Sequence, residues 1–249
     1  RMIFSLIYRL CDRVLAISQA VKEKIVELGE AERSKIKVIY NPFEVQPFRT
    51  FPPIRDRLVL GFVGRLEAVK NPISAVHAVK ILRDRGFNPL LHVIGEGSLR
   101  ADLVQSIADM HLENHVELCG FHPRPFERLQ DCHFYLQPSI SEGFGLAICE
   151  AMSAGIPVIA SSVGGAPEII VHGKTGWLLE KPTAEDLAAT IERASKIDPE
   201  SLASIGQKAS ATVNEKFNVS VYLSNCDDFY NCPLASTEFE SEPHGGKWS

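Results

Sequence analysis

The chain has 249 residues, of which 45% are hydrophobic and 23% are charged. This composition is that of an ordinary globular protein, and it excludes collagen-like, coiled-coil and wholly disordered chains. The formal net charge of −5 gives no global reason to expect binding to nucleic acid or to an anionic membrane. The length suffices for one large domain, or for one domain and a fragment of another.

Cysteine usage indicates the compartment. A chain of this size needs no disulfides to hold a core, and its cysteines form no CxxC pair. Free thiols in a reducing compartment are therefore expected, which indicates a cytoplasmic protein. The six cysteines are Cys11, Cys119, Cys132, Cys149, Cys226 and Cys232.

The first 40 residues show two short apolar runs with a helical pattern between them. A strand is predicted over Val14–Ile17, a helix over Gln19–Leu28 and a second strand over Lys37–Tyr40. Residues 41–56 hold four prolines and no periodic pattern, which is typical of a linker.

From residue 57 to residue 216, apolar β-branched runs alternate with helical patterns, as in parallel βαβ units. The predicted strands are Leu58–Val63, Leu90–Ile94, Val116–Leu118, Phe134–Gln137, Val158–Ala160 and Trp177–Leu179. The predicted helices are Pro72–Arg85, Ser98–Met110, Pro123–Gln130, Leu146–Ala154, Pro167–Val171, Ala184–Lys196 and Pro199–Asn214. The expected fold class is α/β, a Rossmann-like, doubly wound parallel sheet. One more helix is predicted over 217–231, and the polar tail over 232–249 is expected to be disordered.

Ligands on such sheets bind beyond the carboxyl ends of the strands, so the loops there hold the candidate site. After the first strand of the series come Gly64, Arg65 and Lys70. Arg can fork onto two phosphate oxygens and Lys acts as a point charge, which indicates a diphosphate clamp. An ordinary charged surface loop is the alternative. After the second strand, Gly95-Glu96-Gly97 is an incomplete glycine fingerprint, and Ser98 is expected to cap the next helix.

The loop after the fourth strand carries the most specific pattern. Gly143 and Gly145 leave backbone amides open where a helix begins, which makes an anion site. Glu142 precedes them, and Glu150 lies two helical turns further on, on roughly the same face. A carboxylate at either position can accept two hydrogen bonds from a vicinal diol. The alternative, a surface loop with a solvent-facing glutamate, does not account for two glycines ahead of an apolar helix.

Two further patterns lie in the remaining loops. Gly164-Gly165, after the fifth strand, is expected to let the backbone approach a ligand closely in the same crevice. His111 and His115 have the spacing of a metal-binding helix but lack its glutamate. A nicotinamide-dependent oxidoreductase is disfavoured, because no complete glycine fingerprint follows any strand.

In order and spacing, these loops resemble the nucleotide-sugar-binding domain of the family 4 glycosyltransferases, retaining enzymes of the GT-B architecture. The resemblance covers about residues 9 to 217. Its most specific part is the Glu-x7-Glu pair, Glu142 and Glu150, in combination with Arg65 and Lys70. The other matching segments are Gly95–Gly97, Val116–Gly120, Gly155–Ala160, Gly164–Glu168 and His172–Gly176.

The resemblance implies how a nucleoside diphosphate sugar would be bound. Arg65 and Lys70 would hold the diphosphate, and the backbone over 120–122 would lie against the base. Glu150 would bind the ribose and Glu142 the transferred sugar, which makes Glu142 the candidate catalytic residue. The whole implied donor-binding set is Gly64, Arg65, Lys70, Gly95, Gly120, His122, Glu142, Gly143, Phe144, Gly145, Leu146 and Glu150. No obligatory metal and no cofactor is implied, in keeping with the absence of an Asp-x-Asp motif.

Residues 1–40 resemble the end of the family's amino-terminal domain, which supplies the acceptor site and a catalytic histidine. The implied function is the donor half of a hexosyltransferase that acts with retention on a glycan or lipid-linked acceptor. The alternative is a non-catalytic nucleotide-sugar-binding module that needs a separate amino-terminal domain as its partner. A helix expected over Met2–Leu10 is apolar with arginines nearby. It would either pack on that domain or lie peripherally on a membrane.

Overall fold

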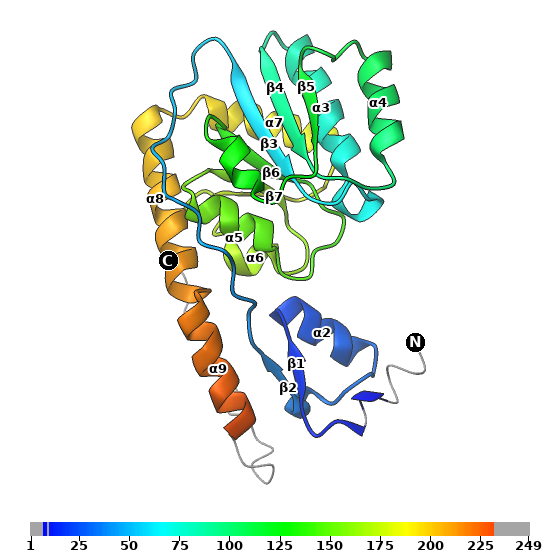
Figure 1. The fold of residues 1–249 in the computed structure, drawn as a ribbon, viewed down its shortest axis with the longest axis vertical. Helices are drawn as coiled ribbons and strands as arrows, with labels where there is room; N and C mark the ends of the chain where they lie inside the picture. The colour runs from blue at the N-terminus through cyan, green and yellow to red at the C-terminus, as the bar shows by residue number, and fades with distance from the viewer. Residues whose placement is uncertain (1–6, 9, 232–249) are drawn as a thin grey trace.

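The computed structural model describes residues 7, 8 and 10–231, and every structural statement below concerns these residues. The tail expected over 232–249 and most of the helix expected over Met2–Leu10 lie outside them. Figure 1 shows a large sheet with helices on both sides and, at one end, a smaller unit built from the first residues. In this part of the chain, no helix is both long enough and apolar enough to cross a bilayer.

Six parallel strands form the main sheet, in the order β5-β4-β3-β6-β7-β8. They are β3 (Leu58–Val63), β4 (Pro89–Ile94), β5 (Val116–Gly120), β6 (Phe134–Gln137), β7 (Val158–Ser161) and β8 (Trp177–Leu179). This topology confirms the predicted doubly wound fold, and every strand lies within two residues of its predicted bounds. The strand order reverses between β3 and β6, and a crevice for ligands opens at such a point beyond the carboxyl ends.

Helices cover both faces of this sheet (Figure 1). One apolar cluster joins the sheet to α3 (Pro72–Asp84), α4 (Arg100–Asp109) and α7 (Ala184–Ser195). The other joins it to α5 (Leu146–Ser153), α6 (Ala166–Ile169) and α8 (Pro199–Lys216).

Strand β6 shows how the sequence produces these two layers. Phe134 and Leu136 belong to the first cluster and Tyr135 to the second, because successive side chains of a strand point to opposite faces. All three are fully buried. Burial of each such side chain contributes about 1.5–3 kcal/mol relative to exposure. A continuous apolar run, rather than an alternating one, is therefore what this central strand requires.

Two local predictions were wrong. The helix predicted over Pro123–Gln130 is only a 3-10 segment, η3 (Pro125–Leu129), which begins no earlier than Pro125 because a proline keeps the preceding residue, Arg124, out of the helical region. Ser98 does not cap α4, whose first residue is Arg100 and which has no side-chain cap. Instead, the backbone N and Oγ of Ser98 donate to the Glu67 carboxylate at 3.1 and 2.8 Å. These two hydrogen bonds connect the loop after β4 to the loop after β3.

The small unit consists of two parallel strands, β1 (Val14–Ala16) and β2 (Ile36–Val38), with α2 (Gln19–Glu27) and η1 (Arg33–Lys35) between them. The last helix, α9 (Val219–Asn231), extends from α8 back toward it (Figure 1). Arg13 donates to the carbonyl of Phe229 at 2.6 Å and lies over its ring. The chain thus enters and leaves the sheet domain from the same side.

A glutamate of the sheet domain holds the start of α2. The Glu168 carboxylate accepts from the backbone N of Gln19 and Ala20, at 2.8 and 2.9 Å, and from the Tyr40 hydroxyl at 2.9 Å. Ser18 caps the same helix and donates to the Gly143 carbonyl at 2.6 Å. A negative charge is favourable at a helix N-terminus, so Glu168 joins the small unit to the sheet domain at this point.

Gly164 and Gly165 pack beneath the Glu142 loop rather than against a ligand. A Cβ on Gly164 would lie 1.5 Å from the Glu142 carbonyl oxygen, and one on Gly165 would lie 2.7 Å from the Phe144 Cα. The expectation that these glycines admit a ligand is therefore wrong. They admit the backbone of the neighbouring loop, whose position they determine.

Replacement of Glu168 by Ala should loosen the small unit without unfolding the sheet. Loss of the three hydrogen bonds that this carboxylate accepts should lower the free-energy cost of opening the small unit by about 1.5–3 kcal/mol. Hydrogen exchange followed by mass spectrometry should show faster exchange across α2, with the β3–β6 peptides unchanged. Glu27→Ala, which removes an exposed carboxylate at the other end of the same helix, is the control. Unchanged exchange at α2 in Glu168→Ala would reject this role.

Gly164→Ala should destabilise the fold more than Gly173→Ala. Both glycines have positive φ, of 54° and 74°, so both substitutions carry the backbone cost of about 1–2 kcal/mol. A Cβ at Gly173 has no atom within 4 Å, whereas the Gly164 Cβ meets backbone, which adds about 1–3 kcal/mol. Urea unfolding of the two variants measures the difference. Equal losses of unfolding free energy in the two variants would show that the Glu142 loop moves aside for the new Cβ at no cost.

Candidate functional site

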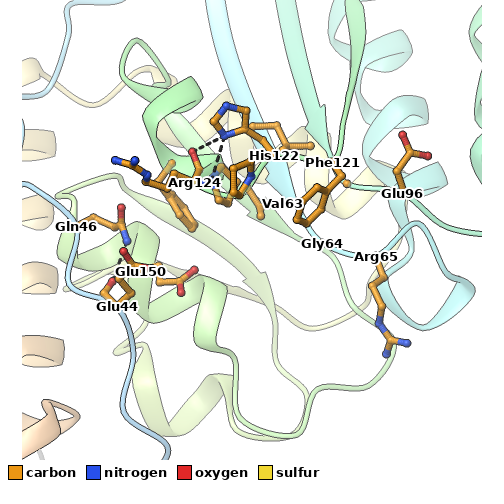
Figure 2. A pocket seen from close by; sticks show the side chains of 15 residues that line it. Glu44, Gln46, Val63, Gly64, Arg65, Glu96, Phe121, His122, Arg124 and Glu150 are labelled. Atoms are coloured by element: carbon orange, nitrogen blue, oxygen red, sulfur yellow. Dashed lines mark hydrogen bonds between the residues drawn. The ribbon is translucent and has the colours of Figure 1, made fainter.

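A cavity of about 370 Å³ opens at the carboxyl ends of β3, β4 and β5 (Figure 2). Five of its lining residues belong to the predicted donor set: Gly64, Arg65, Gly95, His122 and Glu150. They come from three different strand-end loops and from α5. The cavity therefore gathers side chains that the sequence places more than 80 positions apart, at the place where ligands bind to this class of sheet.

Glycines form the floor of the cavity by allowing strand ends to touch. Gly95 has a φ of 146°, and a Cβ there would lie 1.9 Å from the Gly64 carbonyl oxygen. On its other side, the Gly95 backbone N donates to the Gly120 carbonyl at 2.8 Å. Gly64, Gly95 and Gly120 thus bring three loops together with no side chain between them.

One wall follows β5 and is largely backbone and rings. Phe121 is 76% exposed and lines the cavity next to His122 and Arg124. His122 Nδ1 lies 2.8 Å from the carbonyl oxygen and 3.2 Å from the backbone N of Arg124, which fixes the turn. A flat surface with an exposed ring is suited to stacking against a planar ligand group.

The predicted cations separate in the folded chain. Arg65 is exposed and lines the cavity. Lys70 Nζ lies 2.6 Å from Glu142 Oε2, and the two side chains are only 21% and 11% exposed. Gln137 Nε2 and Ser139 Oγ also approach the same oxygen, at 3.4 and 3.5 Å. The candidate catalytic carboxylate is therefore held by one cation and two neutral donors.

Helix α5 begins at Leu146, shortly after Glu142 in the sequence. Gly145, with a φ of 117°, precedes the helix, and no side chain caps it. Leu146, the first helical residue, is 41% exposed. The first amides of a helix have no partner within it, and the dipole adds positive potential there. Gly143 contributes its carbonyl to Ser18, as described above.

Phe144 does not present its ring to the cavity. The ring is buried between Tyr40 and Phe217, with centroids 5.4 and 5.2 Å away, and these two rings contact each other at 5.1 Å. Any contribution of Phe144 to ligand binding must therefore come from its backbone. Its side chain anchors the loop between the start of the linker and the end of α8.

Glu150 lies on α5 and faces the cavity (Figure 2). Burial raises the pKa of its carboxyl to about 7, and the negative charge of Glu44 acts in the same direction. Perturbed carboxylates of this kind gather at functional sites, because a ligand can supply the hydrogen bonds that the fold withholds.

Three polar lining residues, Glu44, Gln46 and Arg124, lie outside every segment that the sequence reasoning assigned to donor binding. Glu44 and Gln46 belong to the linker, where the only available signal was a pair of polar residues between apolar ones. Three metal-ligand types meet elsewhere: the ligand atoms of His92, Glu117 and Cys119 lie within 4.8 Å of one another. This trio does not line the cavity.

Known proteins share this sequence pattern. The family of "Glycosyl transferases group 1" matches residues 47–212. Amylovoran biosynthesis glycosyltransferase AmsK of Erwinia amylovora is 33% identical over 220 residues, which cover 83% of this chain and 53% of that protein. Capsular polysaccharide biosynthesis glycosyltransferase CapM of Staphylococcus aureus is 28% identical over 240 residues, covering 90% of this chain and 63% of that protein. The chain thus spans somewhat more than half the length of these relatives.

Solved structures share the fold. Alr3699/HepE of Anabaena, in complex with UDP and glucose, superposes with a TM-score of 0.82 at 26% identity, and the match covers 93% of this chain and 66% of that one. The structural neighbours are GT-B glycosyltransferases. The family match contains the main sheet and every predicted site residue, and the chain therefore belongs to the group 1 glycosyl transferases.

Proposed function

We propose that this chain is the donor-binding half of a retaining, family 4 hexosyltransferase that takes a nucleoside diphosphate sugar. The observation that carries the proposal is the cavity at the strand ends, with Arg65 at one end and Glu150 at the other (Figure 2). A molecule with an anionic part and a diol matches this distribution of charge. The UDP complex of the Anabaena protein supports the same class of ligand.

The proposed chemistry rests on charge stabilisation. As the bond between sugar and diphosphate breaks, negative charge grows on the diphosphate, where Arg65, Lys70 and the uncapped start of α5 stabilise it. No obligatory metal is proposed, because these groups supply the positive charge. Lys70 is paired with Glu142 in the donor-free chain. Donor binding would give Lys70 a new partner and free Glu142 to accept hydrogen bonds from the transferred sugar.

The remaining parts of the proposal concern partners. The acceptor would be a glycan or a lipid-linked sugar, bound by an amino-terminal domain, in the same chain or separate. The free thiols Cys11, Cys119, Cys132, Cys149 and Cys226 suit a reducing, cytoplasmic location, with peripheral membrane contact through the first residues. The alternative is a non-catalytic nucleotide-sugar-binding module that needs a separate amino-terminal domain as its partner.

Arg65→Ala should weaken the binding of a UDP-hexose by about 1–3 kcal/mol, the scale of a charge-assisted contact. Isothermal titration calorimetry with UDP-, GDP- and ADP-hexoses identifies the donor and measures the loss. Arg55→Ala is the control, because Arg55 is an exposed cation at the amino end of β3, away from the cavity. If no donor binds to the unaltered chain at millimolar concentration, the donor-site proposal fails.

Transfer assays separate the two candidate functions. Turnover of the donor by this chain, alone or with a supplied amino-terminal domain, would reject the non-catalytic module. Proton NMR of the first-formed product reports its anomeric configuration, and inversion would reject the retaining mechanism.

Glu150→Gln should stabilise the donor-free chain at pH 8 and weaken nucleotide binding. The raised pKa means that the fold favours the protonated carboxyl, so stability is lost as the pH rises from about 4.5 through about 7. A neutral glutamine avoids this loss. Because the group is partly solvated, we expect a gain of about 1–2 kcal/mol at pH 8 and a smaller one at pH 5. Urea unfolding at both values measures it, with exposed Glu113→Gln as control. An equal change in the free energy of unfolding at both pH values would contradict the raised pKa of Glu150.

A further inference from the structure

The linker forms part of the cavity wall. Glu44 and Gln46 lie at the same side of the cavity as Glu150, opposite the end that carries Arg65 (Figure 2). Both linker residues precede the sheet domain, and neither belongs to the strand-end loops that supply the other polar groups.

The backbone on both sides of Glu44 is fixed. Phe43 is 5% exposed and packs in the cluster formed with α5 and α8. The Gln46 backbone N donates to Ser153 Oγ at 3.0 Å, and that hydroxyl donates to the Glu150 carbonyl at 2.9 Å. The linker is thus bonded to the same helix turn that carries Glu150. Three residues on, Arg49 N donates to the Ala154 carbonyl at 3.1 Å, which continues the contact past the end of α5.

The side chains at this end are hydrogen-bond acceptors. Glu44 and Glu150 each offer a carboxylate, and their mutual repulsion contributes to the raised pKa of Glu150. One N–H of Gln46 Nε2 donates to the Glu44 carbonyl at 2.9 Å, and the amide oxygen of Gln46 is a further acceptor. The cation nearest along the wall, Arg124, is paired with Glu127 at 2.9 Å. A ligand that satisfies this end must bring several O–H or N–H donors.

We propose that Glu44 is a second ribose-binding residue, which accepts a hydrogen bond from one hydroxyl of the vicinal diol while Glu150 accepts from the other. This inference rests on the proposed function and extends it to the linker. A diol has two O–H donors on adjacent carbons, and each of the two neighbouring carboxyl groups has an oxygen that can accept one of them. Donor binding then depends on the linker being seated on α5, and so on the connection between the two parts of the chain.

The test compares ligands with and without the diol. Calorimetry on the full chain uses UDP, GDP and ADP, and the tightest of the three is compared with its 2′,3′-dideoxy analogue. The unaltered chain should prefer the ribose form by tens of fold. Glu44→Gln should reduce that preference 5- to 20-fold through loss of ribose-form affinity, while its affinity for the dideoxy form stays the same or rises slightly. Asp56→Asn, an exposed acidic residue at the other end of the linker, should change neither value.

An unchanged preference in Glu44→Gln overturns the inference, and so does an equal loss for both ligands, which would show a structural role only. Glu44→Asp, which keeps the charge on a shorter side chain, should give an intermediate preference if the contact is direct. A wild-type chain that binds none of the three nucleotides rejects the donor site itself. A wild-type chain that binds without any preference for the diol rejects the ribose assignment and leaves the donor site standing.

Discussion

The ion pair between Lys70 and Glu142 is the interaction on which the site depends. It joins the segment after β3 to the segment after β6, the two strands between which the sheet order reverses. Both partners are largely withdrawn from water, so neither could stand there alone without a large desolvation cost. The pair therefore leaves no net charge at this point of the donor-free chain. Under the proposed function, a diphosphate that recruits Lys70 takes the place of the Glu142 carboxylate as its partner.

The loop that carries Glu142 is held from two sides. Gly164 and Gly165 lie beneath it with no room for a side chain, and the Ser18 hydroxyl donates to it from the small unit. Glu168, a few residues beyond the glycines, holds the helix that Ser18 begins. The small unit and the sheet domain thus share one set of contacts, and the site loop is in the middle of them. The Ser18 hydroxyl thus connects the small unit to the loop that carries Glu142.

The sequence was sufficient for the sheet, because runs such as Phe134–Gln137 must be buried on both faces and only a covered parallel sheet provides this. It was also sufficient to bring Gly64, Arg65, Gly95, His122 and Glu150 to one place, since the ends of parallel strands meet at one edge. It failed where a contact depends on tertiary approach. A glycine that admits a ligand and one that admits a neighbouring carbonyl look alike, as Gly164 shows. Glu44 lies in a proline-rich linker without periodicity, and nothing local indicates that Phe43 buries the segment against α5. Ser98 has the usual residue type of a helix cap, but Glu67 offers it a better partner.

The three packed rings of Tyr40, Phe144 and Phe217 have a mechanical consequence. The chain crosses between its two parts twice, once just after Tyr40 and once just after Phe217, and both crossings touch the ring of the site loop. Two crossings at one point define a pivot. A rigid rotation of the small unit and α9 against the sheet would turn about this aromatic contact, so the far tip of α9 would sweep the longest arc while the backbone beside Glu142 moved least.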